Sequence, residues 1–216
     1  MRIAALLCAA AAAGIGQTPT PVRTLELKGD LHHVQGIDLD DRHVWVTSVD
    51  RTSRKGFLHE FALPSGEHER TINIEDGDRF HPGGIAADAR SIWIPVAEYR
   101  AHSSAVIQRR DKKTLELISQ FEVSDHIGCV AVNGETVVGG NWDSRELYVW
   151  DHSGKLREKL VNPTGNGFQD MKFDGGALVG SGLLAGRNGA IDWLEFPSLR
   201  AIRRVTFGKT DRGVPF

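Results

Sequence analysis

Cysteine is nearly absent from this chain: Cys8 and Cys129 are the two among its 216 residues. Cys8 lies in an N-terminal segment with the layout of a secretory signal peptide, namely one basic residue, an apolar stretch and small residues at the end. We therefore expect residues 1–16 to be removed. The single thiol that remains cannot form an internal disulfide. Stability must then come from packing, and Cys129 is expected to be a small buried side chain rather than a nucleophile.

Long apolar runs, an excess of one charge and catalytic signatures are also missing. No segment after residue 16 approaches the ~18 apolar residues of a membrane span. The 26 basic and 28 acidic side chains nearly balance, so nucleic acid is not an expected partner. The chain has no nucleophile elbow, zinc-protease helix, phosphate-binding loop or cysteine pair. The signal segment predicts an exported protein, periplasmic or extracellular. The absences predict that it has no membrane span or disulfide, and they name no reaction.

What the chain does contain is a repeat. Four stretches of fifteen residues align without a gap, and each has two short apolar runs joined by a turn rich in Asp, Asn and Gly, which is the pattern of a β-hairpin. Their starts are 48, 45 and 41 residues apart, which is the spacing of four-stranded propeller blades. The stretches begin at Gly36, Gly84, Cys129 and Asp170.

Third and fourth strands follow each hairpin, and no helical segment remains. The sequence therefore predicts an all-β fold, a β-propeller with four recognisable four-stranded blades in one domain, 17–216. Trp45 and Trp93 occupy the same place in the second strand, where they are expected to pack between blades. Residues 22–29 and 210–216 resemble fragments of a further blade and favour truncation from a larger propeller. A four-bladed ring with frayed ends is the alternative. The predicted blades are approximately 33–76, 81–124, 126–162 and 167–208.

The alignment also places polar side chains at equivalent positions. In a propeller, the loop that enters the innermost strand and the loop between the second and third strands lie on the same face. Histidines stand three residues before three of the four starts, carboxylates stand fourteen residues after them, and an arginine, including Arg187, follows each second strand. We therefore expect one mouth of the central channel to gather His33, His81, His126, Asp50, Glu98, Asp143, Arg51, Arg100, Arg145, Trp142, Gln169 and Asp170.

Two interpretations of this set stay open. Imidazoles and carboxylates held by rigid blades would suit a divalent metal, with His33, His81 and His126 as ligands, and the arginines would clamp an anionic ligand. Alternatively, each histidine bonds the carboxylate or a hydroxyl of its own blade and so ties two loops together. The recurrence in successive blades favours the structural interpretation, because a ligand set need not repeat.

Four stretches carry a family resemblance: residues 81–85, 93–100, 139–145 and 169–174. They resemble those of an uncharacterised family of exported bacterial β-propeller proteins, and the resemblance covers nearly all of residues 22–214. It implies a fold and a parent sequence that continues past Phe216, but no reaction. At the level of fold the chain is also similar to the six-bladed gluconolactonase and senescence-marker group, whose axial metal activates water. The histidines at the strand entries depart from the oxygen-rich calcium site of that group.

The leading hypothesis is an exported propeller that binds a small polar or anionic ligand at the channel mouth. One alternative is a metal-dependent hydrolase of the lactonase type, with Glu98 or Asp143 as general base. The other is a propeller that serves as a platform for protein interaction.

Overall fold

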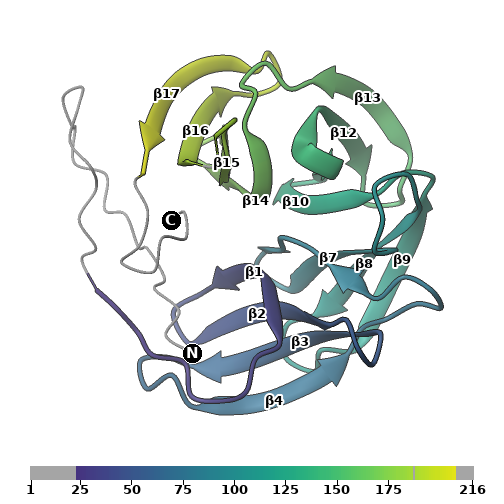
Figure 1. Ribbon diagram of the computed structural model, residues 1–216, viewed down its shortest axis with the longest axis vertical. Helices are drawn as coiled ribbons and strands as arrows, with labels where there is room; N and C mark the ends of the chain where they lie inside the picture. The colour runs from purple at the N-terminus through teal and green to yellow at the C-terminus, as the bar shows by residue number, and fades with distance from the viewer. Residues whose placement is uncertain (1–22, 187, 208–216) are drawn as a thin grey trace.

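The computed structural model describes residues 23–186 and 188–207. Within these ranges the chain forms seventeen β-strands and one 3-10 turn, and it has no helix that is long and apolar enough to cross a membrane. The strands make four separate sheets that follow one another around a common centre (Figure 1). The predicted all-β propeller with four blades is thereby confirmed. The predicted signal peptide, Arg187 and the fragment 210–216 lie outside the described residues.

Each sheet is one blade, and its first strand lies nearest the centre (Figure 1). Blade 1 contains β1 (His33–Leu39), β2 (His43–Asp50), β3 (Lys55–Ala62) and β4 (His68–Asn73). Blade 2 contains β5 (His81–Pro82), β6 (Ala86–Ala87), β7 (Ser91–Ala97), β8 (Ala105–Asp111) and β9 (Leu117–Val123). Blade 3 contains β10 (Ile127–Asn133), β11 (Thr136–Asn141), the 3-10 turn η1 (Trp142–Ser144), β12 (Glu146–Asp151) and β13 (Leu156–Val161). Blade 4 contains β14 (Gly167–Asp174), β15 (Ala177–Leu183), β16 (Gly189–Glu195) and β17 (Arg200–Thr206).

Aspartate side chains shape the hairpin turns between inner strands. In the turn between β1 and β2, Asp40 Oδ1 accepts the backbone N–H groups of Arg42 and His43, at 2.8 and 3.0 Å. Asp88 makes the same two contacts in the turn between β6 and β7. Because such turns satisfy backbone donors locally, Asp is favoured there, and the turn residues predicted the hairpins correctly.

The apolar core lies in layers between neighbouring blades. Trp45 packs with Leu58, Ile85 and Ile94 between blades 1 and 2, and Trp93 belongs to the next layer, between blades 2 and 3. Both indoles are fully buried, which confirms their predicted packing role. Burial of a large apolar side chain stabilises a fold by roughly 1.5–3 kcal/mol. The fold is therefore held by contacts between blades as much as by the sheets themselves.

Glycines let the inner strands meet closely at the centre. A Cβ atom on Gly83 would lie 1.9 Å from the carbonyl oxygen of Gly128 in the next blade, and one on Gly36 would lie 2.6 Å from Gly83 O. Pro82 and the two glycines after it also divide the inner strand of blade 2 into β5 and β6. A single parallel bridge then joins Gly84 to Cys129. The aligned starts of the repeat are thus points of contact between blades.

Residues 23–31 run along blade 1. Lys28 forms a parallel bridge with Glu67, and Leu27 is buried against Phe61. Apart from this bridge, residues 23–29 form no strand within the described structure. The segment packs along blade 1, and its place in a further blade stays a prediction.

Candidate functional site

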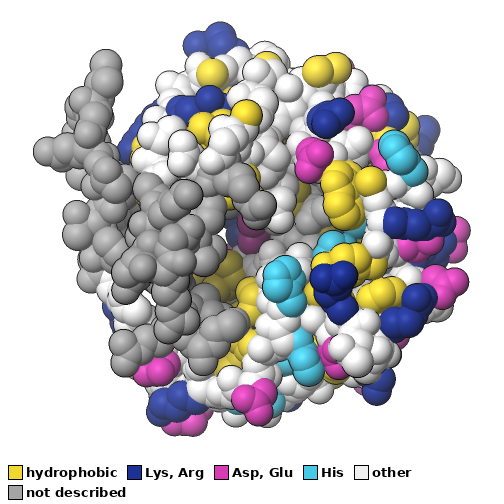
Figure 2. Space-filling view, in the orientation of Figure 1, with side chains coloured by type: hydrophobic (Ala, Val, Ile, Leu, Met, Phe, Trp, Pro, Cys, Tyr) yellow, Lys and Arg dark blue, Asp and Glu magenta, His cyan; other side chains and the backbone are white. Residues whose placement is uncertain are grey.

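The structure brings part of the predicted residue set together around a small cavity at the channel mouth. Its volume is about 130 Å³. Histidine side chains gather near the centre of this face in Figure 2. The cavity walls come from the inner-strand entries of all four blades and from η1 of blade 3. The lining residues are Gln35, His81, Gly83, His126, Gly128, Asn141, Trp142, Asp143, Phe168 and Gln169.

His126 ties blade 3 to blade 2. Its Nδ1 lies 3.1 Å from the carbonyl oxygen of Glu98 and 3.0 Å from that of Arg100. A carbonyl oxygen only accepts, so Nδ1 carries the proton and Nε2 is left as an acceptor in the neutral ring. Burial lowers the pKa of His126, and the two carbonyl contacts offset this lowering in part. The imidazole is consequently held as one neutral tautomer.

His81 stands beside His126, with 5.5 Å between the ring centroids, and it packs against Tyr99 at 4.2 Å. Its Nδ1 is buried and has no hydrogen-bond partner within the described structure. Burial, followed by the charges of His126, His33 and Arg51, lowers the pKa of His81 to about 3. The ring is therefore neutral at physiological pH, and this residue of the cavity lining contains a buried polar atom without a partner among the described residues. A buried polar atom without a partner is uncommon in folded proteins.

The turn η1 has an unusual backbone. Asp143 and Ser144 both adopt positive φ, 61° and 49°, although neither is glycine. Such residues cost free energy and are found most often at binding sites and tight turns. Ser144 is fixed by its Oγ donating to Phe168 O of blade 4, at 3.0 Å. The turn leaves Trp142 37% exposed, with its ring 4.6 Å from that of His126.

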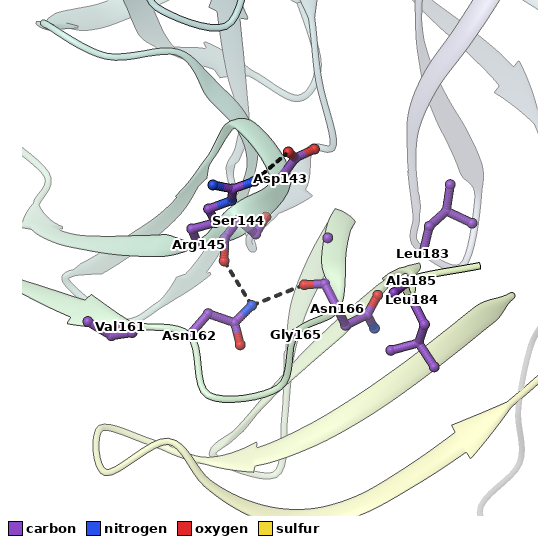
Figure 3. A pocket seen from close by; sticks show the side chains of 11 residues that line it. Asp143, Ser144, Arg145, Val161, Asn162, Gly165, Asn166, Leu183, Leu184 and Ala185 are labelled. Carbon is purple, nitrogen blue, oxygen red and sulfur yellow. Dashed lines mark hydrogen bonds and ion pairs between the residues drawn. The ribbon is translucent and has the colours of Figure 1, made fainter. Parts of the chain in front are cut away.

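A larger cavity of about 470 Å³ adjoins the first and shares Asp143 with it. It lies between blades 3 and 4, and Figure 3 shows its side chains. The Asn162 amide donates to the carbonyl oxygens of Ser144 and Asn166, at 2.8 and 3.1 Å, and so holds two loops together. Arg145 lies 3.7 Å from Asp143, and its side chain is largely exposed. This cavity therefore offers one carboxylate, one guanidinium and several amides.

Other predicted site residues do not line the mouth cavity, and local partners engage them. Glu98 accepts from Arg100, and from the backbone and hydroxyl of Ser104. Asp50 accepts from the backbone of Thr52 and from Ser53. These bonds, led by Arg100 for Glu98 and by Ser53 for Asp50, lower the pKa of both carboxyls.

Two further predicted side chains, His33 and Arg51, do not line the cavity either. His33 Nδ1 lies 2.5 Å from Gln35 Nε2, and the Arg51 guanidinium lies over the Tyr99 ring at 4.8 Å. Among the described residues, one group of three histidine and carboxylate ligand atoms lies within a mutual 4.8 Å, and it is His43, Glu60 and Glu69. The three predicted histidines therefore do not form such a group.

The sequence analysis considered that each repeated histidine bonds a group of its own blade. In the structure, several hydrogen bonds of these repeated positions join neighbouring blades instead. His126 contacts blade 2, Thr47 Oγ1 of blade 1 donates to Gly83 O of blade 2 at 2.8 Å, and Ser144 of blade 3 donates to blade 4. The sequence repeat gave the positions of these groups but not their partners, because partners in the next blade are remote along the chain.

Asp170 belongs to a charged cluster at the centre that the repeat did not predict. Its Oδ2 accepts the backbone N–H of Ile37 in blade 1 at 3.1 Å, and its Oδ1 lies 2.8 Å from Lys172 Nζ. Lys172 also lies 3.8 Å from Asp38 and donates to Ile85 O of blade 2. Burial opposes the Lys172 charge, but the two carboxylates outweigh it and raise its pKa. Burial raises the pKa of Asp170, and Lys172 opposes that change.

Cys129 is a buried filler next to this cluster, as predicted. The thiol is free and completely buried, and it contacts Ser144 Oγ and Phe168 O. Burial, followed by the charge of Asp170, raises the pKa of Cys129 to about 12. The thiolate needed for nucleophilic chemistry is therefore scarce at neutral pH.

Residues 47–169 match a family described as a family of unknown function, DUF6454. A search of curated proteins finds none that matches the chain. Among solved structures, the WD40 domain of Neurospora crassa Pan2 is 11% identical, with a TM-score of 0.53 over 82% of this chain and 51% of that one. Myxococcus xanthus glutaminyl cyclase is 12% identical, with a TM-score of 0.57 over 79% of this chain and 71% of that one.

Kuenenia stuttgartiensis hydrazine synthase is 14% identical, with a TM-score of 0.54 over 83% of this chain and 51% of that one. The chain therefore spans about half the length of the Pan2 domain and of the hydrazine synthase chain. At these identities the likeness extends to the fold alone, and unrelated functions share such folds.

Proposed function

The chain belongs to the DUF6454 family of unknown function, and we propose that it binds a small polar molecule at the mouth of its propeller. The observation that supports this proposal best is that His81, whose buried Nδ1 has no partner among the described residues, lines the mouth cavity. Beside it, Trp142 is held in partial exposure by a turn with two positive φ angles. An unsatisfied polar atom, an exposed indole and a strained turn around one cavity are typical of a binding site.

The lining of the mouth cavity restricts what it can hold. Its volume corresponds to about four water molecules at ~30 Å³ each, so only a small molecule or one end of a larger one fits. The neutral imidazoles of His81 and His126 and the amides of Gln35, Asn141 and Gln169 supply hydrogen bonds without formal charge. The indole of Trp142 adds an apolar face of the kind that packs against sugar rings. A neutral polyhydroxy compound suits this lining best.

An anionic group would reach a different part of the site. The larger cavity is lined by the guanidinium of Arg145, which lies 3.7 Å from Asp143. A ligand that carries a carboxylate would place its polar body at the mouth and its charge beside Arg145. Comparison of a sugar with the corresponding sugar acid tests this division directly.

The experiment is a thermal-shift screen of sugars, polyols and sugar acids, followed by calorimetric titration of any that bind. We expect Trp142→Ala and Gln169→Ala to weaken binding at least tenfold. Ile118→Ala, which trims an exposed side chain on outer strand β9, should leave it unchanged. Arg145→Gln should weaken the acid and spare the neutral sugar. Failure of the whole panel to bind, or binding that survives both mouth variants, would count against the proposal.

A hydrolytic role would rest on Asp143. Among the described residues, it is the carboxylate that lines both cavities, whereas Glu98 is engaged by Arg100 and Ser104. A general base must reach the proton it removes, so the lactonase alternative requires Asp143. Turnover of simple lactones that disappears in Asp143→Asn would support this alternative, and turnover that persists would exclude Asp143 as the base.

We also propose that the protein acts outside the cytoplasm, in the periplasm or beyond the cell, after removal of residues 1–16. The segment has the composition of a signal peptide, and the buried, free Cys129 needs no partner in an oxidising compartment. Expression of the full chain in a Gram-negative host, followed by fractionation and intact mass measurement, tests this. An unshortened product in the cytoplasm would contradict it.

A further inference from the structure

Blade 1 carries a histidine and two glutamates whose ligand atoms converge far from the mouth. His43 begins β2, Glu60 lies in β3 and Glu69 lies in β4, and one ligand atom from each lies within 4.8 Å of the other two. His43 Nε2 lies 3.4 Å from Glu69 Oε2. The mouth lies at the other end of β2, beyond Asp50. This cluster is therefore separate from the site proposed above.

The geometry points to a metal site here: we propose that His43, Glu60 and Glu69 bind one divalent transition metal ion, with zinc as the representative ion. One imidazole and two carboxylates are a common ligand set for zinc, and they leave a position for water. His43 and Glu69 are partly exposed, with side-chain exposures of 32% and 41%, so an ion can enter from solvent. Glu60 is almost completely buried and forms the floor.

The lone pairs of Glu60 permit this role. Its carboxylate accepts the indole N–H of Trp45 at 2.8 Å and two N–H groups of Arg70 at 2.9 and 3.0 Å. These three bonds occupy three of about four acceptor positions, and Oε1, with a single bond, retains one for a metal. Arg70 and Trp45 also fix the orientation of the carboxylate, as hydrogen-bond donors to metal-binding carboxylates do.

Asp40 lies near the other ring nitrogen of His43, with Oδ1 3.8 Å from His43 Nδ1. Asp40 is itself held in place, because Lys112 Nζ lies 2.8 Å from its Oδ2 and the turn backbone donates to its Oδ1. At this distance Asp40 makes no hydrogen bond to the ring, but its negative charge lies on the side of His43 opposite to Glu69.

The local backbone is shared by all four blades, but the three side chains are not. Each blade has a register shift between its third and fourth strands, and Glu69 is the extra residue of this shift in blade 1. A contact required by the fold would recur at the same positions in the other blades, whereas a ligand set need not. At the positions of His43, Glu60 and Glu69, blade 2 has Ser91, Arg109 and Ile118, blade 3 has Thr136, Val149 and Arg157, and blade 4 has Ala177, Trp193 and Ile202.

The test is zinc affinity, measured on the full chain without a polyhistidine tag by competition with a chromophoric chelator. We expect wild type to bind one equivalent, and His43→Gln and Glu69→Gln to lower the affinity at least tenfold. His152→Gln is the matched control, because His152 also lies 3.4 Å from a glutamate, Glu135, and against a tryptophan, Trp93. Within the described part of the chain, this pair has no third ligand. The zinc affinity of His152→Gln should equal that of wild type.

Three results would overturn the proposal: no zinc binding by wild type, equal affinity in His43→Gln and wild type, or an equal loss in His152→Gln. A fourth variant, His81→Ala, separates this cluster from the mouth. Zinc binding that is lost in His81→Ala and kept in His43→Gln would assign the ion to the mouth instead. Because His43 and Glu69 are partly exposed and their replacements are polar, both variants should fold, and circular dichroism checks this.

Discussion

The imidazoles of His81 and His126 are neighbours at the mouth, but they are bonded differently. His126 donates to two backbone carbonyls of blade 2, whereas His81 Nδ1 has no partner among the described residues. Both rings also pack against other rings, Tyr99 for His81 and Trp142 for His126. The hydrogen bonds are therefore the main difference between them, so His126 has a structural task that His81 lacks.

This difference predicts unequal costs of replacement by alanine. His126→Ala removes the donor from the Arg100 carbonyl, whereas Glu98 O keeps the backbone N–H of Arg100. Loss of this donor costs about 1–3 kcal/mol in addition to lost packing. His81→Ala loses packing alone and removes an unsatisfied polar atom. We expect urea unfolding to show His126→Ala as the less stable variant by at least about 1 kcal/mol. Equal stability of the two would mean that the carbonyl contacts contribute nothing.

The predicted residue set illustrates what a repeat can and cannot say about a site. Equivalent positions on successive blades do lie on the same face, so His81, His126, Trp142, Asp143 and Gln169 meet around one cavity as predicted. Other members of the set contact local partners instead, as Glu98 does with Arg100. The alignment of the repeats does not determine the directions of these side chains. The repeat aligns backbone positions, and side-chain partners depend on local sequence that differs between blades.

At the scale of elements, the inner strands are where sequence and packing are most closely coupled. The period and the turn residues predicted the hairpins because alternation and Asp turns act locally. The close approach of the inner strands is not local, and glycine makes it possible. The sequence marks these glycines as aligned starts but does not say what lies opposite to them.

Two glycines that face each other provide a test of this close approach. A methyl group on Gly83 would meet Gly128 O at 1.9 Å, whereas one on Gly128 would meet nothing nearer than 3.9 Å. We expect Gly83→Ala to destabilise the fold by about 3 kcal/mol or more, at the upper end of overpacking costs. Gly128→Ala should stay within ~0.5 kcal/mol of wild type. Urea unfolding of both variants measures this, and a tolerated alanine at position 83 would refute the close contact.

At the scale of the whole molecule, the central cluster joins blades that are distant along the chain. Asp170 of blade 4 accepts from Ile37 of blade 1, 133 residues earlier, and Lys172 contacts blades 1 and 2. The first and last blades thus meet at the centre, although their outer strands lie apart in Figure 1. Asp38 and Lys172 escaped the sequence analysis because a pairing between residues so far apart along the chain leaves no local pattern.

Buried histidines make the stability of the whole fold sensitive to mild acid. Burial, followed by the charges of His68 and His32, lowers the pKa of His59 to about 4, and the pKa of His81 is lowered to about 3. In the unfolded chain both titrate near 6.5. Between pH 6.5 and 4 the unfolded chain therefore takes up protons that the folded chain does not. The stability of the fold decreases as the pH is lowered through this range. Above pH 6.5 this contribution is fully present.

Each such histidine adds at most about 1.4 kcal/mol of lost stability per pH unit in this window. We expect wild type to lose stability between pH 7.5 and 5, before the carboxylates protonate, and His59→Gln to lose up to about 2 kcal/mol less. His102→Gln, which replaces an exposed histidine, should follow wild type. Urea midpoints at the two pH values decide the matter. If His59→Gln loses as much stability as wild type, His59 is not held neutral by its burial among Ser48, Thr71 and the neighbouring rings, and the acid sensitivity has another source.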